Sequence, residues 1–229
     1  MSLKLLTIQT ATPAGSVALT DGGRLLGELF LDVGRPHGGW LLAAADQLLA
    51  AAGMTVNDLD GFGVTIGPGS FTGLRVGLAT VKGLALATGK PIAGVSTLAT
   101  LALQAPYAAL PVCALLDARK REVYAGLFAW EEGLPPPLGP ERVQPPEQLL
   151  AGLSGPVLFA GDGAVAYRTL IVRQLGPRAR FLPEVCAPPR AAHAAVLARQ
   201  AFAAGAAFPA GQVNPVYIRP SEAELGKHC

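Results

Sequence analysis

The sequence has few charged residues and no long basic run. Only 15% of its 229 residues are charged, the formal net charge is +2, and the longest basic run is the three residues from Arg119 to Arg121. A strongly nucleic-acid-binding surface is therefore not expected, and any contact with RNA should be indirect or minor. Apolar residues make up 51% of the chain. That proportion excludes a disordered protein and implies a large apolar area that must be covered.

Cysteine is scarce, and long hydrophobic runs are absent. Cys113, Cys186 and Cys229 are far apart and form no C-x-x-C pair, which excludes a disulfide framework and a cysteine zinc site. The longest apolar run, Trp40 to Ala52, is too short to cross a bilayer and carries Asp46. The first ten residues lack the apolar core of a signal peptide. We expect a cytoplasmic protein that does not associate with membranes.

The usual sequence signatures of catalytic sites are also missing. The stretch Gly67 to Gly77, GPGSFTGLRVG, lies between a predicted strand and a predicted helix, where backbone N–H groups can hold a phosphate. However, no lysine follows the glycines as in a Walker loop, and Thr72 stands where a dinucleotide fingerprint needs glycine. Ser70 lacks the G-x-S-x-G elbow of a hydrolase, and no two histidines fall within a helical turn. We expect no catalytic residue, cofactor or metal. The alternatives for the turn are nucleotide binding and a structural role in which Ser70 or Thr72 caps the helix.

Hydrophobic periodicity and turn residues predict alternating strands and helices. In the first half the strands are 3–10, 16–20, 24–31, 60–66 and 91–95, and the helices are 40–52, 72–87 and one that begins at 96. A capping box is predicted at Thr55-x-x-Asp58. After residue 106 the pattern partly repeats, with strands 112–116, 122–130 and 157–160 and helices 146–152, 164–175 and 190–204.

The order βββαβαβα, given twice, matches the ribonuclease H-like unit whose duplication makes the actin-like (ASKHA) fold. The predicted fold class is therefore two-lobed α/β. The expected lobes are residues 1–105 and 106–229, with the last helix free to pack back on the N-terminal lobe. The charged residues of Asp117 to Glu122 should lie at the exposed turn of a hairpin in the second lobe.

Two helices of the first lobe carry more apolar residues than one sheet-facing side requires. In helix 72–87, Leu74 and Leu78 belong to a core stripe, whereas Gly73 and Gly77 begin a second face of small residues. Such excess apolar surface usually marks an interface, although burial by the chain's own C-terminal helix is the alternative. The predicted partner-binding residues are Trp40, Leu41, Ala44, Leu48, Phe71, Gly73, Leu74, Val76, Gly77, Thr80, Gly83 and Ala87.

Around GPGSFTGLRVG the sequence resembles the TsaB family, also called YeaZ. The resemblance extends over nearly the whole chain. It includes LLTIQTAT from Leu5, KGLAL from Lys82, GVSTLATLA from Gly94, DARKREVYAGLF from Asp117, and AGDGA and PVYIRP further on.

This resemblance implies a non-catalytic subunit that supports formation of threonylcarbamoyladenosine in tRNA. It implies pairing with the related transferase TsaD, with the ATPase TsaE joining them, and we expect a homodimer when the chain is alone. The metal-binding histidines of the TsaD family correspond to Thr97 and Leu101. Gln9 replaces the first-strand aspartate of actin-like ATPases, and an amide is a poor anchor for hydrated Mg²⁺. The alternative function is an ATP-binding phosphotransferase of the actin-like superfamily.

Overall fold

The computed structural model describes residues 2–34, 36–131 and 133–219, so Cys229, His228 and the end of PVYIRP lie outside the described residues. The chain divides into two compact units, Met1–Thr100 with Pro188–Pro215 and Leu101–Ala187 with Val216–Cys229. The expected lobes were residues 1–105 and 106–229. In the structure the boundary between them lies after Thr100, five residues earlier. Residues 188–215, which carry the last helix, return to the first unit.

The first unit is built on a mixed five-stranded sheet of order β3-β2-β1-β4-β5. β1 pairs antiparallel with β2 and parallel with β4, and the capping box from Thr55 to Asp58 is present. The predicted order βββαβαβα is confirmed. Its elements are β1 (Lys4–Gln9), β2 (Gly15–Asp21), β3 (Arg24–Leu31), α1 (Leu41–Ala51), β4 (Gly61–Gly67), α2 (Phe71–Thr88), β5 (Ile92–Ser96) and α3 (Thr97–Ala102).

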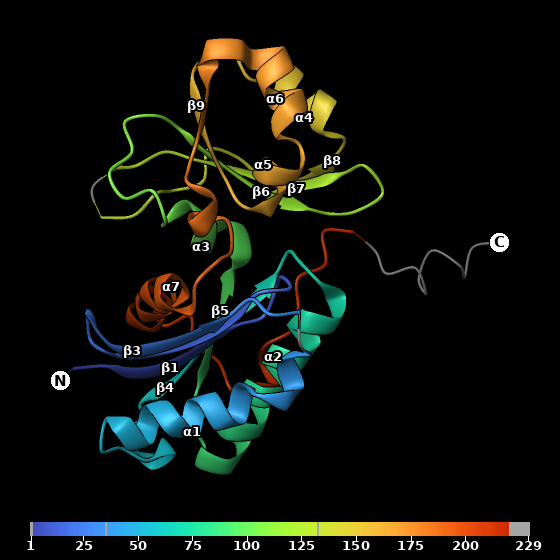
Figure 1. Cartoon of the computed structure of the whole chain (residues 1–229). Coiled ribbons are helices and arrows are strands. Elements are labelled where there is room, and N and C mark those ends of the chain that lie inside the picture. The colour runs from blue at the N-terminus through green and yellow to red at the C-terminus, as the bar shows by residue number, and fades with distance from the viewer. Residues whose placement is uncertain (1, 35, 132, 220–229) are drawn as a thin grey trace. The chain divides into compact units, whose positions relative to one another are not determined.

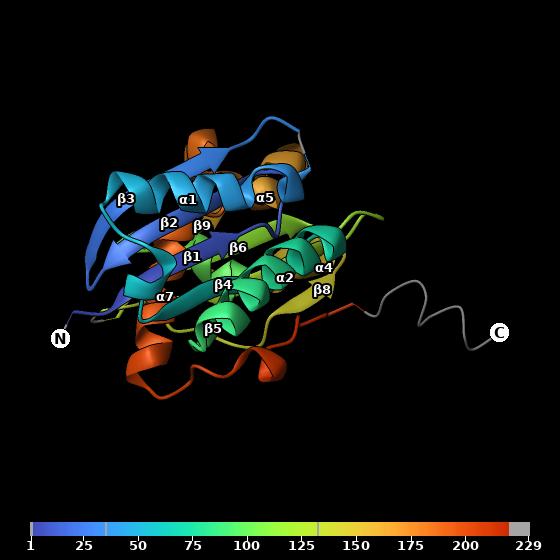
Figure 2. The ribbon, with the colours of Figure 1, turned by 90° about the horizontal axis from the view of Figure 1, so that it is seen from below.

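Helices cover both faces of this sheet, as Figures 1 and 2 show. α1 and α2 pack on one face, and α7 (Ala191–Ala203) packs on the other across β1, β2, β4 and β5. The central strands β1 and β2 are therefore buried on both sides. α7 lies close to β4 because β4 has glycine at two positions that face α7. A Cβ at Gly61 would lie 2.3 Å from the Phe202 ring, and one at Gly63 would lie 2.9 Å from Ala198 Cβ.

The second unit repeats the topology of the first. Its sheet has the order β10-β9-β6-β7-β8, so in both sheets the first strand lies between the second and the fourth. Two short strands, β8 and β10, were not predicted, and a break at Tyr167 divides the predicted helix 164–175. The elements are β6 (Val112–Asp117), β7 (Val123–Phe128), β8 (Arg142–Gln144), α4 (Pro146–Ala151), β9 (Val157–Ala160), α5 (Asp162–Ala166), α6 (Arg168–Leu175) and β10 (Ala179–Phe181).

Within the described part of the chain, no helix combines the length and apolar character needed to cross a bilayer.

The hairpin between β6 and β7 exposes Arg119, Lys120 and Arg121, as expected, and all three have a positive φ. Asp117 holds this hairpin through a hydrogen bond from Arg119 N (2.9 Å) and an ion pair with the Arg119 guanidinium (3.2 Å).

The N-terminus of α7 is anchored to the first sheet by Glu28 and Ser16. The Glu28 carboxylate, whose side chain is only 6% exposed, accepts hydrogen bonds from the Arg190 guanidinium (2.6 Å) and from Ala192 N (3.2 Å). Ser16 Oγ accepts a hydrogen bond from Ala191 N at 2.7 Å. These contacts satisfy backbone donors that the first turn of a helix leaves unpaired. They fix residues 188–215 to the first unit.

Replacing Glu28 should therefore loosen α7. We expect Glu28→Ala to lower the free energy of unfolding by about 2–3 kcal/mol, because charged hydrogen bonds are lost and buried donors are left unpaired. Urea denaturation measures this loss. Asp46→Ala, at an exposed position of α1, is the control and should stay within about 0.5 kcal/mol of the parent. An equal effect of the two changes would contradict the anchoring role of Glu28.

Candidate partner-binding surface and the glycine turn

Three glycines of the stretch Gly67 to Gly77 are required by the chain segment that follows β1. A Cβ at Gly69 would lie 2.4 Å from Ala11 O, one at Gly73 would lie 2.0 Å from Thr10 O, and one at Gly77 would lie 2.2 Å from Thr10 Oγ1. Thr10 Oγ1 also donates a hydrogen bond to Gly73 O at 2.8 Å. Gly73 and Gly77 thus allow close approach of Thr10, at Gly73 by its backbone carbonyl and at Gly77 by its side chain.

The start of α2 is closed by local hydrogen bonds. Ser70 is the N-cap, and its Oγ accepts from Gly73 N at 3.2 Å. Ser70 N donates to Ala11 O at 2.7 Å. Two N–H groups that a phosphate cradle would use are therefore already paired within the protein, which favours the structural interpretation of the turn.

Gln9 is a buried structural amide at the end of β1. Its Nε2 donates to Ala14 O (3.3 Å) and Pro189 O (3.0 Å), and its Oε1 accepts from Ala11 N. The side chain is fully buried. An aspartate here would offer no N–H donor and would be a buried charge. The amide therefore holds the segment after β1 together with the segment that leads into α7.

In the described part of the chain, the cysteine and histidine side chains that could take part in catalysis are buried, partly buried or hydrogen-bonded within the protein. Burial raises the pKa of the Cys113 thiol to about 12, so it remains protonated. Burial lowers the pKa of His193, although the nearby Glu28 opposes this. His37 places Nε2 2.9 Å from Thr12 O, and a carbonyl there requires Nε2 to be the protonated nitrogen. Among the described residues, no group of three or more His, Cys, Asp or Glu side chains could hold a metal ion.

The twelve predicted partner-binding residues separate into a buried and an accessible set. The buried residues cannot contact a partner while the first unit stays folded, because they pack against β1, β2 and β4 or against the segment after β1. The buried set is Leu41, Ala44, Gly73, Leu74 and Gly77, and the accessible or half-buried set is Trp40, Leu48, Phe71, Val76, Thr80, Gly83 and Ala87.

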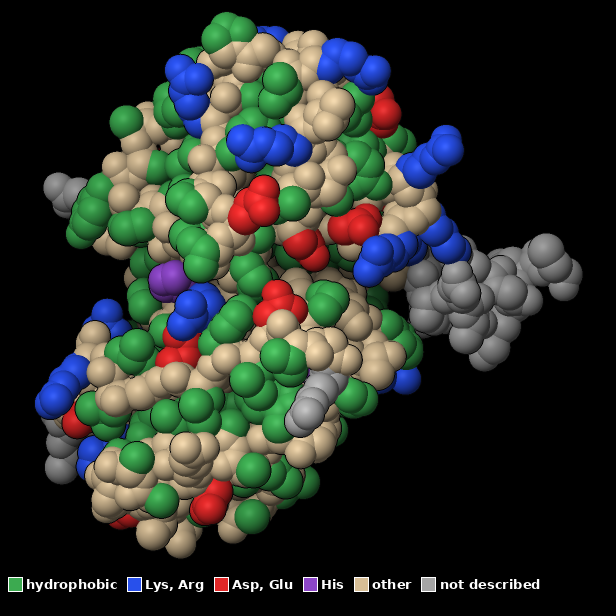
Figure 3. All heavy atoms as spheres, viewed as in Figure 1, with side chains coloured by type: hydrophobic (Ala, Val, Ile, Leu, Met, Phe, Trp, Pro, Cys, Tyr) green, Lys and Arg blue, Asp and Glu red, His purple; other side chains and the backbone are tan. Residues whose placement is uncertain are grey.

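The outer sides of α1 and α2 form an apolar surface with little charge. Leu42 is 58% exposed and Leu86 is 75% exposed. α1 contains one charged residue, Asp46, and α2 contains two, Arg75 and Lys82. Figure 3 shows few charged side chains among the hydrophobic ones over the outer side of α1. We call the following residues the α1–α2 surface: Leu42, Phe71, Ala79, Gly83, Leu86 and Ala87.

Leu42, Ala79 and Leu86 were absent from the predicted set. The outer face of α2 could have been identified from helical spacing, because it lies on the side of the core stripe away from Gly73 and Gly77. Its positions are Phe71, Arg75, Ala79, Lys82 and Leu86.

The repeated strand order and the helices around each sheet define the class of two-lobed actin-like α/β proteins. (R)-2-hydroxyglutaryl-CoA dehydratase component A from Acidaminococcus fermentans shares this fold, with a TM-score of 0.50 and 12% identity over 89% of this chain and 99% of that chain.

Closer similarities identify the family. The family model for TsaD, tRNA N6-adenosine threonylcarbamoyltransferase, matches residues 32–227. The tRNA threonylcarbamoyladenosine biosynthesis protein TsaB of Escherichia coli (strain K12) is 34% identical over 223 residues, which is 95% of each chain. YeaZ from Pseudomonas aeruginosa superposes with a TM-score of 0.84 at 35% identity over 94% of this chain and 99% of that chain. The chain belongs to the TsaB (YeaZ) family.

The inner and outer faces of α2 predict opposite effects for two glycine substitutions. Gly73→Ala should lower the free energy of unfolding by about 2–3 kcal/mol, because its Cβ overlaps a backbone carbonyl that cannot easily retreat. Gly83 has open space around its missing Cβ, so Gly83→Ala should raise stability by up to about 1 kcal/mol through helix propensity. Thermal and urea unfolding measure both. Equal tolerance of the two changes would contradict the close approach of Thr10 to α2.

Proposed function

We propose that this chain is a non-catalytic subunit that supports threonylcarbamoyladenosine formation in cytoplasmic tRNA by binding a TsaD-related transferase. The TsaD family model matches most of the chain, and the E. coli relative is named for this biosynthesis. Threonylcarbamoyl transfer would then take place on the transferase, with an ATPase of the TsaE type joining the pair. Contact of this chain with tRNA would be indirect or minor, since its net charge is only +2.

The α1–α2 surface is the observation that carries this proposal. Two adjacent helices expose Leu42, Phe71 and Leu86 with only three charged residues along their length. An exposed apolar patch with little charge is the composition of a protein interface centre. The C-terminal helix α7 does not cover it, because α7 packs on the opposite face of the sheet. A protein partner is the occupant that fits.

We propose that the chain has no catalytic activity because of the residues at three positions. Gln9 uses both ends of its amide in backbone hydrogen bonds. Thr97 and Leu101, which correspond to the metal-binding histidines of the transferase family, are both fully buried. A threonine hydroxyl and an aliphatic side chain are poor ligands for iron or zinc.

Charges placed on the α1–α2 surface should weaken partner binding. Leu42→Glu lies in the first turn of α1 and Leu86→Lys in the last turn of α2, so each new charge agrees with its helix dipole and should leave the fold intact. We expect each change to weaken the complex with a TsaD-type transferase at least about tenfold, because a desolvated charge opposes an apolar interface. Calorimetric titration measures the Kd, and threonylcarbamoyl incorporation into tRNA measures the functional loss.

Val172→Lys in the last turn of α6 is the matched control, since Val172 is 48% exposed and belongs to the second unit. It should bind like the parent chain. Parent-like binding by the Leu42→Glu, Leu86→Lys double variant would contradict the proposed interface.

We also propose that the isolated chain forms a homodimer through this surface. Light scattering at micromolar concentration should then show a dimer for the parent and a monomer for the double variant.

The ATP-binding alternative predicts a different result for the isolated chain. Because the Gln9 amide is fully engaged and carries no charge, we expect calorimetry with ATP and Mg²⁺ to show no saturable heat. Micromolar binding of ATP that depends on Mg²⁺ would instead favour a phosphotransferase of the actin-like superfamily.

A further inference from the structure

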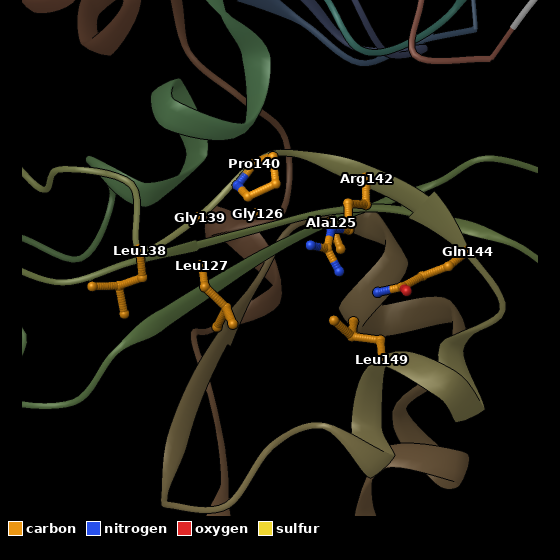
Figure 4. Close-up of a pocket in the computed structure, with 9 residues that line it drawn as sticks. All are labelled: Ala125, Gly126, Leu127, Leu138, Gly139, Pro140, Arg142, Gln144 and Leu149. Atoms are coloured by element: carbon orange, nitrogen blue, oxygen red, sulfur yellow. The ribbon is translucent and has the colours of Figure 1, made fainter.

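The second unit contains a small pocket on the helix-covered side of its sheet, beside the edge strand β8. Its volume is about 210 Å³. Ala125 and Leu127 of β7 and Leu149 of α4 form its apolar floor, while Leu138 lies at its rim (Figure 4). Nothing in the proposed docking role uses this pocket.

An irregularity in strand pairing produces the pocket. Ala125 pairs with Arg142, and Leu127 O accepts a hydrogen bond from Leu138 N at 2.8 Å. Between these two pairings, the three residues from Gly139 to Glu141 lie opposite a single residue of β7, Gly126. Pro140 has no N–H and cannot continue the ladder. The segment bulges away from β7 and leaves the space over Ala125 and Leu127 open.

Two polar side chains converge on this space. Arg142 and Gln144 are two positions apart on β8 and so project from the same face of the strand. Figure 4 shows the guanidinium and the amide nitrogen directed toward each other above Leu149. Within the described residues, neither side chain has an ion pair or hydrogen bond to another protein group. Their donors are therefore available to a ligand.

We propose that this pocket binds a small aliphatic carboxylate. The guanidinium fork of Arg142 matches the two oxygens of a carboxylate, and the amide N–H of Gln144 adds a third donor. Ala125, Leu127 and Leu149 provide apolar contact for a short branched chain. The volume suits a ligand of fewer than ten heavy atoms, since pockets for drug-sized molecules begin at about 300 Å³.

The test is an NMR titration of the full chain with 4-methylpentanoate. Backbone N–H signals of residues 125–127, 139 and 141–144 should shift with a Kd of the order of 1 mM, a reasonable affinity for a ligand of this size. The neutral 4-methylpentanamide should bind at least about tenfold more weakly, because it cannot form the ion pair with Arg142. The carboxylate could also come from the C-terminus of a peptide chain. N-acetyl-leucine, which mimics such a terminus, tests this source. If it binds more tightly than the free acid, the carboxylate belongs to a chain terminus, and if it binds more weakly, the ligand is a free acid.

Arg142→Gln keeps a polar side chain at an exposed position and should weaken 4-methylpentanoate binding at least about tenfold. Arg180→Gln is the matched control, because Arg180 is exposed on β10, the opposite edge strand of the same sheet. It should bind like the parent. The absence of shifts at these residues up to about 50 mM, or equal binding by Arg142→Gln and the parent, would overturn the proposal.

Discussion

The first unit depends on the backbone after β1 reaching the N-terminus of α2 without any intervening side chain. Thr10 and Ala11 occupy the positions that Cβ atoms of Gly69, Gly73 and Gly77 would otherwise take. Hydrogen bonds in both directions, Thr10 Oγ1 to Gly73 O and Ser70 N to Ala11 O, then fix this contact. Because β1 is the central strand and α2 covers one face of the sheet, this contact sets the position of the helix that carries most of the α1–α2 surface.

A similar constraint acts on the other face of the sheet. Gly61 and Gly63 let α7 approach β4 closely, and the Gln9 amide connects the end of β1 to Pro189 just before α7. Gln9 thus serves as a hydrogen-bonding centre between these two segments. An uncharged amide supplies the two N–H donors that these contacts need, and a carboxylate has none. Gln9 is therefore part of the packing that holds the start of α7.

Sequence reasoning predicted the long, periodic elements and the fold class, because β1 to β7 and α1, α2 and α7 carry strong hydrophobic patterns. It missed β8 and β10, since three residues are too few to establish a period, and their pairing is decided by β7 and β9. It also could not assign Gly73 and Gly77 correctly to an inner face. A small-residue face indicates that something approaches closely, but only the structure shows that Thr10 is the neighbour.

The two faces of α2 clarify what a substitution in this helix can reveal. On the inner face a larger residue at Gly73 or Gly77 meets the backbone or side chain of Thr10, so loss of partner binding in such a variant would follow from loss of the fold. On the outer face Gly83 and Leu86 are exposed, so a change there meets no packed neighbour and leaves the fold intact. Evidence for an interface must therefore come from the outer positions. The inner glycines are explained by the fold and give no independent evidence for a partner.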